Sequence, residues 1–333
     1  MRAVIKAIAS YLPKNIEVNE ATRITKKIGI FSRHIAESDE CASDLAFHAA
    51  EKMFSKGLID RNSIDFVILC TQSPDFLLPT TACILQNRLG LSKKCGAFDF
   101  NLGCSGYVYG LSIAKGLIET RQATNILLLT AETYSKYIHP EDNTVRPIFG
   151  DAGTATLIYA EETEIDGLSA FHFGTDGEGA KHLIVPAGAS RNPAVLTPVT
   201  EEVDKYSNRR TNYHMYMNGS AIIKFAEDVV PETVSQILSK ANINKEQVDY
   251  FIFHQANKFI LKHLQQKCEL LGSPFWNDVE TVGNTVSCTI PLAIEALILV
   301  KDPSQLSRVM VVGFGVGLSW AGCLVDLSHM TRI

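Results

Sequence analysis

The sequence lacks the long apolar segments and the excess of one charge that mark several classes of protein. Its 333 residues contain no run of about 18 uncharged apolar residues, so no membrane-spanning helix is expected. The apolar run near the amino terminus, which Pro13 interrupts, is too short for the core of a signal peptide. The net charge of −5 gives no general reason to bind nucleic acid. These absences predict a cytoplasmic protein whose partners include neither a membrane nor a nucleic acid.

Paired cysteines are absent as well. The eight cysteines are widely spread and none belongs to a Cys-X-X-Cys pair, so neither a zinc site nor a disulfide scaffold is expected. Several lie within apolar runs, as Cys70 and Cys323 do, and the usual role there is a small buried side chain. The sequence also contains no metal-binding motif and no dinucleotide-binding fingerprint, so no metal and no bound cofactor are expected.

The composition is that of a folded α/β protein. Hydrophobic residues make up 46% and charged residues only 20%, which excludes intrinsic disorder and is typical of a chain that buries surface in an oligomer. Short apolar runs alternate with helix-like stretches. The expected strands are 66–70, 96–100, 125–130, 154–160, 249–253, 278–282, 308–314 and 322–327. The expected helices are 41–56, 80–89, 105–120, 218–240, 257–270 and 288–299.

These elements occur twice in the same order, which indicates an internal duplication with a period of half the chain. The strand after Asp65 corresponds to the strand after Asp249, and a helix follows both. We therefore expect two halves, 1–165 and 166–333. The polar stretch 161–217, which carries Lys205, Arg209 and Arg210, is expected to be a turn-rich surface excursion.

Duplicated halves usually place a site at their interface, in the turns that follow corresponding strands. One such turn contains Cys104 before an apolar helix, where the helix N-terminus favours a thiolate. His254 and Asn284 lie in two corresponding turns of the second half. Each residue alone is better explained by a structural role: a small buried residue, a core histidine or an N-cap. Together, a thiol, an imidazole and a carboxamide form a set suited to acyl transfer.

A glycine-rich turn at 313–317 can aim backbone N–H groups at a thioester oxygen beside this nucleophile. A phosphate cradle is the alternative, but neither of its usual glycine patterns is present.

The chain resembles the β-ketoacyl–acyl-carrier-protein synthase III family of the thiolase superfamily. The motifs occur in family order over essentially the whole chain: GIFSRHIA (29–36), NLGCSGY (101–107), FGDAGTA (149–155), MNGSAIIKFA (217–226), HQAN (254–257), GNTVSCTIPLA (283–293) and GFGVGLSWAG (313–322). The resemblance implies an α/β fold of five layers, α-β-α-β-α, with two pseudo-symmetric halves that work as a homodimer.

The resemblance also implies a role for individual residues. Cys104 would take the acyl group from a primer thioester, and His254 and Asn284 would stabilise the enolate formed from malonyl–acyl-carrier protein. The backbone N–H groups of Cys104 and Val316 would form the oxyanion hole. No cofactor is implied, since CoA or the phosphopantetheine of the carrier protein is only the substrate carrier. Further substrate contacts are implied at Asn257, Gly219, Leu78 and Phe314, and docking of the carrier protein at Lys224, Lys258 and Lys262.

The chain departs from the family pattern at the places that hold CoA. Arg23 stands where members carry a tryptophan that stacks on the adenine, and Asn143 replaces the arginine on the other side of the ring. This predicts weak binding of CoA, with a carrier-protein donor or CoA held by other residues as the alternatives. Phe259 replaces a docking arginine, and Val316 replaces the middle glycine of a GGG turn, so that turn must suit a β-branched residue.

Four other functions compete with a decarboxylative condensation. A related acyltransferase would move the acyl group to a hydroxyl or amine, and an inactive scaffold subunit would pair with an active partner. The complete Cys-His-Asn set favours condensation over both. A thiolase would need a second catalytic cysteine, for which Cys288 is poorly placed, and a hydroxymethylglutaryl-CoA synthase would need a catalytic glutamate. If His254 has an ordinary pKa, activity should fall in acid between about pH 5 and 7.

Overall fold

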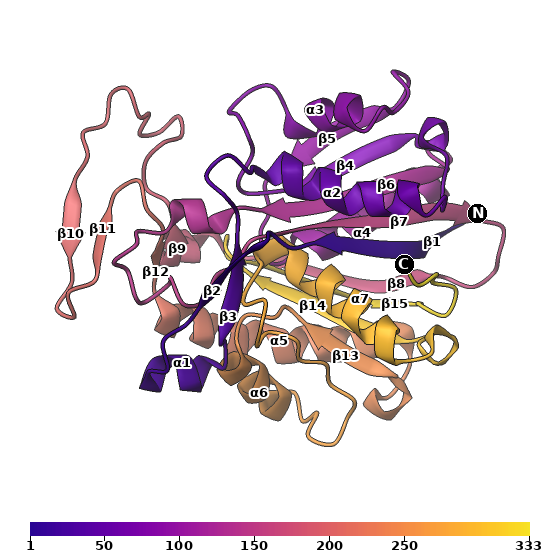
Figure 1. The fold of residues 1–333 in the computed structure, drawn as a ribbon. Helices are drawn as coiled ribbons and strands as arrows, with labels where there is room; N and C mark the ends of the chain where they lie inside the picture. Colours follow the sequence, from indigo (N-terminus) through magenta and orange to yellow (C-terminus); the bar gives the residue numbers. More distant parts are fainter.

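Two mixed β-sheets organise the chain, each built from strands of one half of the sequence (Figure 1). The computed structural model describes all of residues 1–333. The first sheet has the order β1 (Arg2–Tyr11), β7 (Ala152–Glu161), β6 (Asn125–Glu132), β4 (Phe66–Cys70) and β5 (Gly96–Phe100). The second has the order β8 (Leu168–Thr175), β15 (Ser319–Val325), β14 (Val309–Gly315) and β13 (Tyr250–Phe253).

The two sheets repeat one topology. In each, the outer two pairings are antiparallel, namely β1–β7–β6 and β8–β15–β14. The next pairing is parallel in both, β6 with β4 and β14 with β13. The duplication expected from the sequence is therefore present in the strand order. A division into halves at residue 165, which stays a prediction, would fall between β7 and β8.

Helices form the other three layers (Figure 1). Two buried helices, α4 (Gly106–Glu119) and α7 (Thr289–Val300), contact both sheets and so form the central layer. The first sheet is covered on its outer face by α2 (Ala42–Ser55) and α3 (Thr81–Arg88). The second sheet is covered by α5 (Gly219–Ala241), against which α6 (Lys258–Lys267) packs. A short helix, α1 (Arg23–Ile28), lies against α6.

The sequence explains which helices are central. In α4 the apolar residues surround the helix, which suits a helix packed between two sheets. Gly110 lets it approach β6 closely, since a Cβ there would lie 2.7 Å from a methyl carbon of Leu128. In α2, by contrast, buried alanines and Leu45 follow helical spacing while Lys52 and Glu51 remain outside.

All six predicted helices are confirmed, with ends that differ by at most three residues. The expected turn-rich excursion at 161–217 is wrong in part, because its first segment is β8, the edge strand of the second sheet. The rest of it contains the pair β9 (Leu183–Ile184) and β12 (Tyr216–Met217) and the hairpin β10 (Glu201–Val203) and β11 (Arg209–Thr211). The sequence analysis also did not predict the edge strand β1 or the two-stranded sheet formed by β2 (Asn15–Val18) and β3 (Ser32–Ile35).

The strand predicted at 278–282 does not form. The chain meets β13 only at a single bridge between Phe251 and Phe275, just after Pro274. Further along, the carbonyl of Glu280 accepts hydrogen bonds from the backbone N–H groups of Phe31 and Ser32, in the other half of the chain. Residues 278–282 therefore form backbone hydrogen bonds with the first half of the chain instead of adding a strand to the second sheet. None of the helices is both long and apolar enough to cross a membrane.

The packing of α2 on the first sheet depends on the absence of a side chain at Gly153. A Cβ there would lie 2.3 Å from the carbonyl carbon of Leu45, which is rigid helix backbone. We expect Gly153→Ala to lower the free energy of unfolding by about 1–3 kcal/mol, the usual cost of overpacking. Gly116→Ala is the matched control, because its Cβ would meet nothing within 4 Å and should stabilise α4 by about 0.5–1 kcal/mol. Urea denaturation compares them, and equal stabilities would contradict the prediction.

Candidate active site

A cavity of about 960 Å³ lies between the two halves and brings together most of the predicted site. Cys104, His254 and Asn284 all line it. Three of the predicted substrate-binding residues line it too, namely Asn257, Gly219 and Phe314. No aspartate or glutamate lines this cavity.

Cys104 lies in the turn between β5 and α4 and is only 5% exposed. The end of β14 passes directly against it. A Cβ on Gly315 would lie 2.6 Å from the Cys104 Sγ, and a Cβ on Gly313 would lie 2.5 Å from the Cys104 carbonyl oxygen. Glycine at both positions therefore leaves room for the thiol and for a group attached to it.

The Cys104 thiol is neutral in the free protein, which corrects the expectation of a thiolate. Burial raises its pKa to about 12, and the carboxyl of Glu132 adds to the rise. The backbone N–H groups of Val316 and of Cys104 itself act in the opposite direction. The α4 helix begins only at Gly106, after its N-cap Ser105, and its dipole does not offset the loss of water around the sulfur.

His254 follows β13 and is held from two sides. Its backbone N–H donates to the Val312 carbonyl at 2.8 Å, which continues the pairing of β13 with β14. Its ring Nδ1 lies 2.7 Å from the hydroxyl oxygen of Thr289, the first residue of α7. The Phe314 ring stands nearly perpendicular to the imidazole, at 5.5 Å between centroids. With Nδ1 engaged, Nε2 is the ring nitrogen left without a protein partner.

Burial lowers the pKa of His254 to about 3. The imidazole is therefore neutral throughout the range in which most enzymes work. The sequence-based prediction that protonation of His254 reduces activity between pH 5 and 7 is wrong. That prediction assumed an ordinary pKa for His254, and burial lowers it.

Asn284 belongs to the second half but is paired with the first. Its backbone N–H donates to the Ile148 carbonyl at 2.9 Å, and its own carbonyl accepts from the Gly150 N–H at 3.0 Å. The side-chain Oδ1 accepts a hydrogen bond from the Val286 N–H at 2.9 Å. This fixes the orientation of the carboxamide and leaves its Nδ2 group free to donate. Val286 adopts a φ of 57°, a strained conformation for a β-branched residue.

Val316 follows β14 and does not have a positive φ, so the turn accepts a β-branched residue as the sequence required. It lines a neighbouring cavity of about 500 Å³ instead of the main one. The two cavities share Tyr134 and Leu183, so they adjoin on either side of these residues.

The remaining predicted residues lie outside the main cavity. Leu78 is 82% exposed. Two of the three predicted docking lysines already have carboxylate partners: Lys224 pairs with Asp228 on α5, and Lys258 pairs with Glu280. Lys262 is exposed on α6 and has no ionic partner.

Sequence reasoning missed several residues that shape the site. Glu132, at the end of β6, is fully buried and accepts hydrogen bonds from the hydroxyls of Ser287 and Ser73. Burial raises its pKa to about 8. Thr289 was missed because its role appears only when α7 meets β13. Glu132 could have been noticed as a charged residue that ends an otherwise apolar strand.

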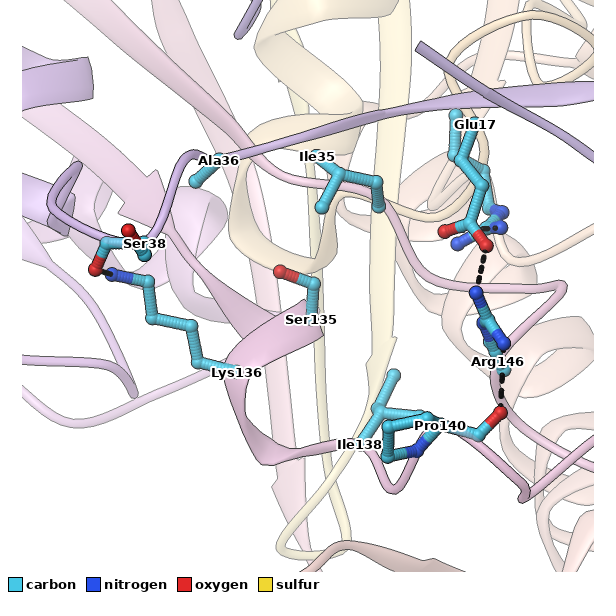
Figure 2. A pocket seen from close by; sticks show the side chains of 10 residues that line it. Glu17, Ile35, Ala36, Ser38, Ser135, Lys136, Ile138, Pro140 and Arg146 are labelled. Carbon is cyan, nitrogen blue, oxygen red and sulfur yellow. Dashed lines mark hydrogen bonds and ion pairs between the residues drawn. The ribbon is translucent and has the colours of Figure 1, made fainter. Parts of the chain in front are cut away.

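A separate cavity of about 220 Å³ contains several cations but none that is free (Figure 2). Arg33 and Arg146 both bind Glu17. Lys136 donates to the backbone carbonyls of Ser38 and Glu40. Since each of these cations already has partners within the protein, the residues serve to join β2, β3 and the segment after β6. No group of three or more His, Cys, Asp or Glu side chains is arranged to hold a metal ion.

Comparison with known proteins decides the family. The family described as 3-oxoacyl-[acyl-carrier-protein (ACP)] synthase III matches residues 98–177, and its C-terminal counterpart matches residues 238–327. This chain belongs to the synthase III family. A protein of Clostridioides difficile named beta-ketoacyl-[acyl-carrier-protein] synthase III is 35% identical over 97% of this chain and 98% of its own length.

Solved synthase III structures have the same fold. A crystal structure of a 3-oxoacyl-(acyl-carrier-protein) synthase III is 47% identical, covers 98% of this chain and all of its own, and superposes with a TM-score of 0.94. A 3-oxoacyl-(acyl-carrier protein) synthase from Burkholderia xenovorans, 34% identical, covers 99% of this chain and 95% of its own with a TM-score of 0.89. The five-layer thiolase-like fold inferred from the motifs is thus confirmed.

The low pKa of His254 leads to a test of its charge state. We expect the ring NMR signals of His254, assigned with a His254→Ala variant, to show no titration between pH 8 and pH 5, because the buried ring stays neutral until about pH 3. A midpoint near 6.5 would mean that water reaches the imidazole in solution. The same burial predicts lower stability in acid, since below about pH 6.5 only the unfolded state can take up this proton.

Proposed function

We propose that this synthase III family member catalyses a decarboxylative Claisen condensation of an acyl primer with malonyl–acyl-carrier protein. The observation that carries the proposal is that Cys104, His254 and Asn284, from three separate turns, line one cavity that contains no carboxylate. A thiol can accept the acyl group there, and two neutral donors can receive negative charge from an enolate.

In the first half-reaction the Cys104 sulfur attacks the carbonyl of the primer thioester. The carrier leaves as a thiol with the proton that Cys104 loses, and an acyl-cysteine remains. Since the free thiol has a pKa of about 12, its proton must leave during the attack, and it passes to the thiolate of the departing carrier. We assign the oxyanion hole of the tetrahedral intermediate to the backbone N–H groups of Cys104 and Val316, which hydrogen-bond the sulfur in the free protein.

In the second half-reaction the malonyl thioester binds with its carbonyl oxygen near His254 and Asn284. Loss of CO₂ leaves an enolate whose charge gathers on that oxygen. Nδ2 of Asn284 and Nε2 of His254 donate to it, which requires the imidazole proton on Nε2 and the Thr289 hydroxyl donating to Nδ1. The carbanion then attacks the acyl-cysteine, and Cys104 leaves with its electron pair and is reprotonated as the 3-oxoacyl thioester departs.

The carrier protein and a second copy of the chain are the partners we propose. Docking at Lys224, Lys258 and Lys262 is supported by their exposure on α5 and α6. For Lys224 and Lys258, a carrier-protein acid would have to replace Asp228 or Glu280. A homodimer is supported by Phe76, Leu77 and Leu78, an exposed apolar run beside the site. No cofactor enters the reaction, because the carrier group is part of the substrate.

The competing functions have less support. An acyltransferase needs the nucleophile and a base, but it has no use for a carboxamide that Val286 fixes in the wall of the cavity. A thiolase would use Cys288, yet that side chain is fully buried, hydrogen-bonded to Thr130 and the Ala152 carbonyl, and outside the cavity. A catalytic glutamate, as in a hydroxymethylglutaryl-CoA synthase, is not found among the lining residues.

Replacing the nucleophile tests the first half-reaction. Cys104→Ala should abolish covalent uptake of the acyl group and leave the fold intact, because alanine fits between Gly313 and Gly315. Intact-protein mass spectrometry after incubation with acyl-CoAs and acyl-carrier proteins measures the uptake. Cys83→Ala, at an exposed cysteine, is the matched control and should load normally. A Cys104→Ala protein that still gains the acyl mass would remove Cys104 as the nucleophile.

Removing the enolate donors tests the second half-reaction. His254→Ala and Asn284→Ala should reduce CO₂ release from malonyl–acyl-carrier protein by ~10²–10³-fold, the usual cost of one oxyanion-type donor. Asn284→Ala should leave acyl loading of Cys104 largely in place. The double variant should be little worse than the worse single one, because both donors act on one charge. If Asn284→Ala lost acyl loading but released CO₂ normally, the acyltransferase function would be favoured instead.

A further inference from the structure

Glu132, at the end of β6, is a fully buried carboxyl that the proposed reaction does not use. One of its oxygens, Oε1, lies 2.6 Å from the Ser287 hydroxyl oxygen. The other, Oε2, lies 3.1 Å from the backbone nitrogen of Gln72 and 3.2 Å from the Ser73 hydroxyl oxygen. None of these partners is a cation. Burying an acid without a counter-ion destabilises a protein, and such groups are typical of functional sites.

Ser287 lies in the middle of the turn that holds both proposed enolate donors. On one side of it, the Val286 N–H donates to the Asn284 carboxamide oxygen at 2.9 Å. On the other side, the Thr289 hydroxyl oxygen lies 2.7 Å from Nδ1 of His254 and 3.1 Å from the Val286 carbonyl oxygen. The contact between Ser287 and the buried carboxyl on β6 therefore fixes this turn of the second half to the first half.

The other oxygen of Glu132 supports the turn of the proposed nucleophile. Gln72, whose backbone N–H that oxygen accepts, extends its side chain to this turn, where Nε2 donates to the Asn101 carboxamide oxygen at 3.0 Å. The Gln72 side chain also packs beside Gly103, since a Cβ at Gly103 would lie 2.5 Å from Gln72 Oε1. Cys104 is the next residue. One buried carboxyl thus joins the turn of the nucleophile to the turn of the enolate donors.

Glu132 is an uncharged acid at neutral pH. Burial raises its pKa to about 8, and the carboxyl of Asp151 adds to the rise, whereas its three hydrogen-bond donors act in the opposite direction. The Gln72 N–H keeps Oε2 an acceptor, so the acid proton lies on Oε1 and is donated to the Ser287 oxygen. When Glu132 ionises, the direction of this bond reverses and the Ser287 hydroxyl donates. The link between the two turns is therefore present in both states, and only the charge changes.

The titratable groups that face Glu132 from the surrounding elements include no cation. They are Cys70 on β4, Cys104 before α4, Tyr134 and Tyr137 after β6, Asp151 before β7 and Cys288 before α7. Burial raises the pKa of each of these thiols and phenols, so they stay neutral while Glu132 ionises. The charge of Glu132 acts on the Cys104 sulfur, whose pKa it raises. An uncompensated negative charge there opposes the formation of an enolate in the same buried site.

We propose that Glu132 is a positioning residue for the condensation: as an uncharged acid it joins the Cys104 turn to the Asn284 turn, and its ionisation slows the release of CO₂ from the malonyl thioester. The inference rests on the proposed function, because it assigns the group that sets the geometry and the alkaline limit of that reaction. Cys104 and His254 have pKa values of about 12 and about 3, so neither titrates just above neutral pH. A loss of activity on the alkaline side of neutrality is therefore assigned to Glu132.

Initial rates of CO₂ release from malonyl–acyl-carrier protein, measured at about pH 7 and about pH 9, provide the test. In the wild type we expect kcat to be about 10-fold lower at the higher pH, because the uncharged fraction of an acid with a pKa of about 8 falls by that factor. Glu132→Gln, which keeps the hydrogen bonds but cannot ionise, should match the wild type at neutral pH and show no fall. Glu295→Gln, the same change at a half-buried carboxyl that accepts from the Ser10 N–H, is the control and should keep the fall.

A second pair of variants tests the geometry apart from the charge. Ser287→Ala removes the link between Glu132 and the turn of the enolate donors. It should lower kcat for CO₂ release about 10-fold at neutral pH and leave KM unchanged, because the donors are displaced while the binding of the carrier protein is not. Ser73→Ala is the matched control, since it removes a hydroxyl from the other oxygen of Glu132 and leaves that turn in place. It should remain close to the wild type.

The outcomes separate this role from the proposed function. An alkaline fall that is absent from the wild type or persists in Glu132→Gln overturns the inference. A Glu132→Gln protein that is slow at every pH, or a Ser287→Ala protein as active as Ser73→Ala, overturns it as well. If the wild type neither acylates Cys104 nor releases CO₂, the proposed function fails instead. The NMR signals of the Asn284 carboxamide, assigned with Asn284→Ala, then decide: they must shift with a midpoint near pH 8 in the wild type and not in Glu132→Gln.

Discussion

A short stretch of backbone pairing between the two halves holds the whole site together. Asn284 exchanges hydrogen bonds with Ile148 and Gly150, so a turn of the second half is fixed to the first. Because β14 also presses Gly313 and Gly315 against Cys104, the proposed nucleophile and the proposed enolate donors are positioned by the same interface. Any shift of one half relative to the other would separate the Cys104 thiol from Asn284.

Burial gives this site its chemical character. The Cys104 thiol and the His254 imidazole are both neutral, and the cavity that holds them contains no carboxylate. Neutral groups suit a reaction in which negative charge appears only for a moment, first on a tetrahedral oxygen and then on an enolate, because fixed donors in a dry site stabilise such charge strongly. The uncompensated charges lie at Lys27 and Lys205, on residues exposed to solvent.

The sequence was sufficient for the helices, the duplicated strand order and the three turns of the site, because each carries a local pattern. It failed where the answer depends on contacts between distant segments. The segment 278–282 alternates like a strand, but its carbonyls are used by Phe31 and Ser32. The pKa of His254 depends on burial by both halves, which no local pattern reports. The sequence showed Lys205 only as one of several basic residues in a polar surface segment. Its position at the cavity depends on the hydrogen bond from the Asn143 backbone N–H to the Asn208 carboxamide oxygen.

The neutral state of Cys104 has a consequence for the life of the protein in the cell. Peroxides and alkylating agents react with thiolates far faster than with thiols, so Cys104, the proposed nucleophile, is protected from oxidation in the free protein by its pKa of about 12. Of the eight free cysteines, Cys104 is among the buried ones, whereas Cys83 is exposed. Reactivity would then arise only with the thioester in place, and damage would fall first on cysteines that the reaction does not need.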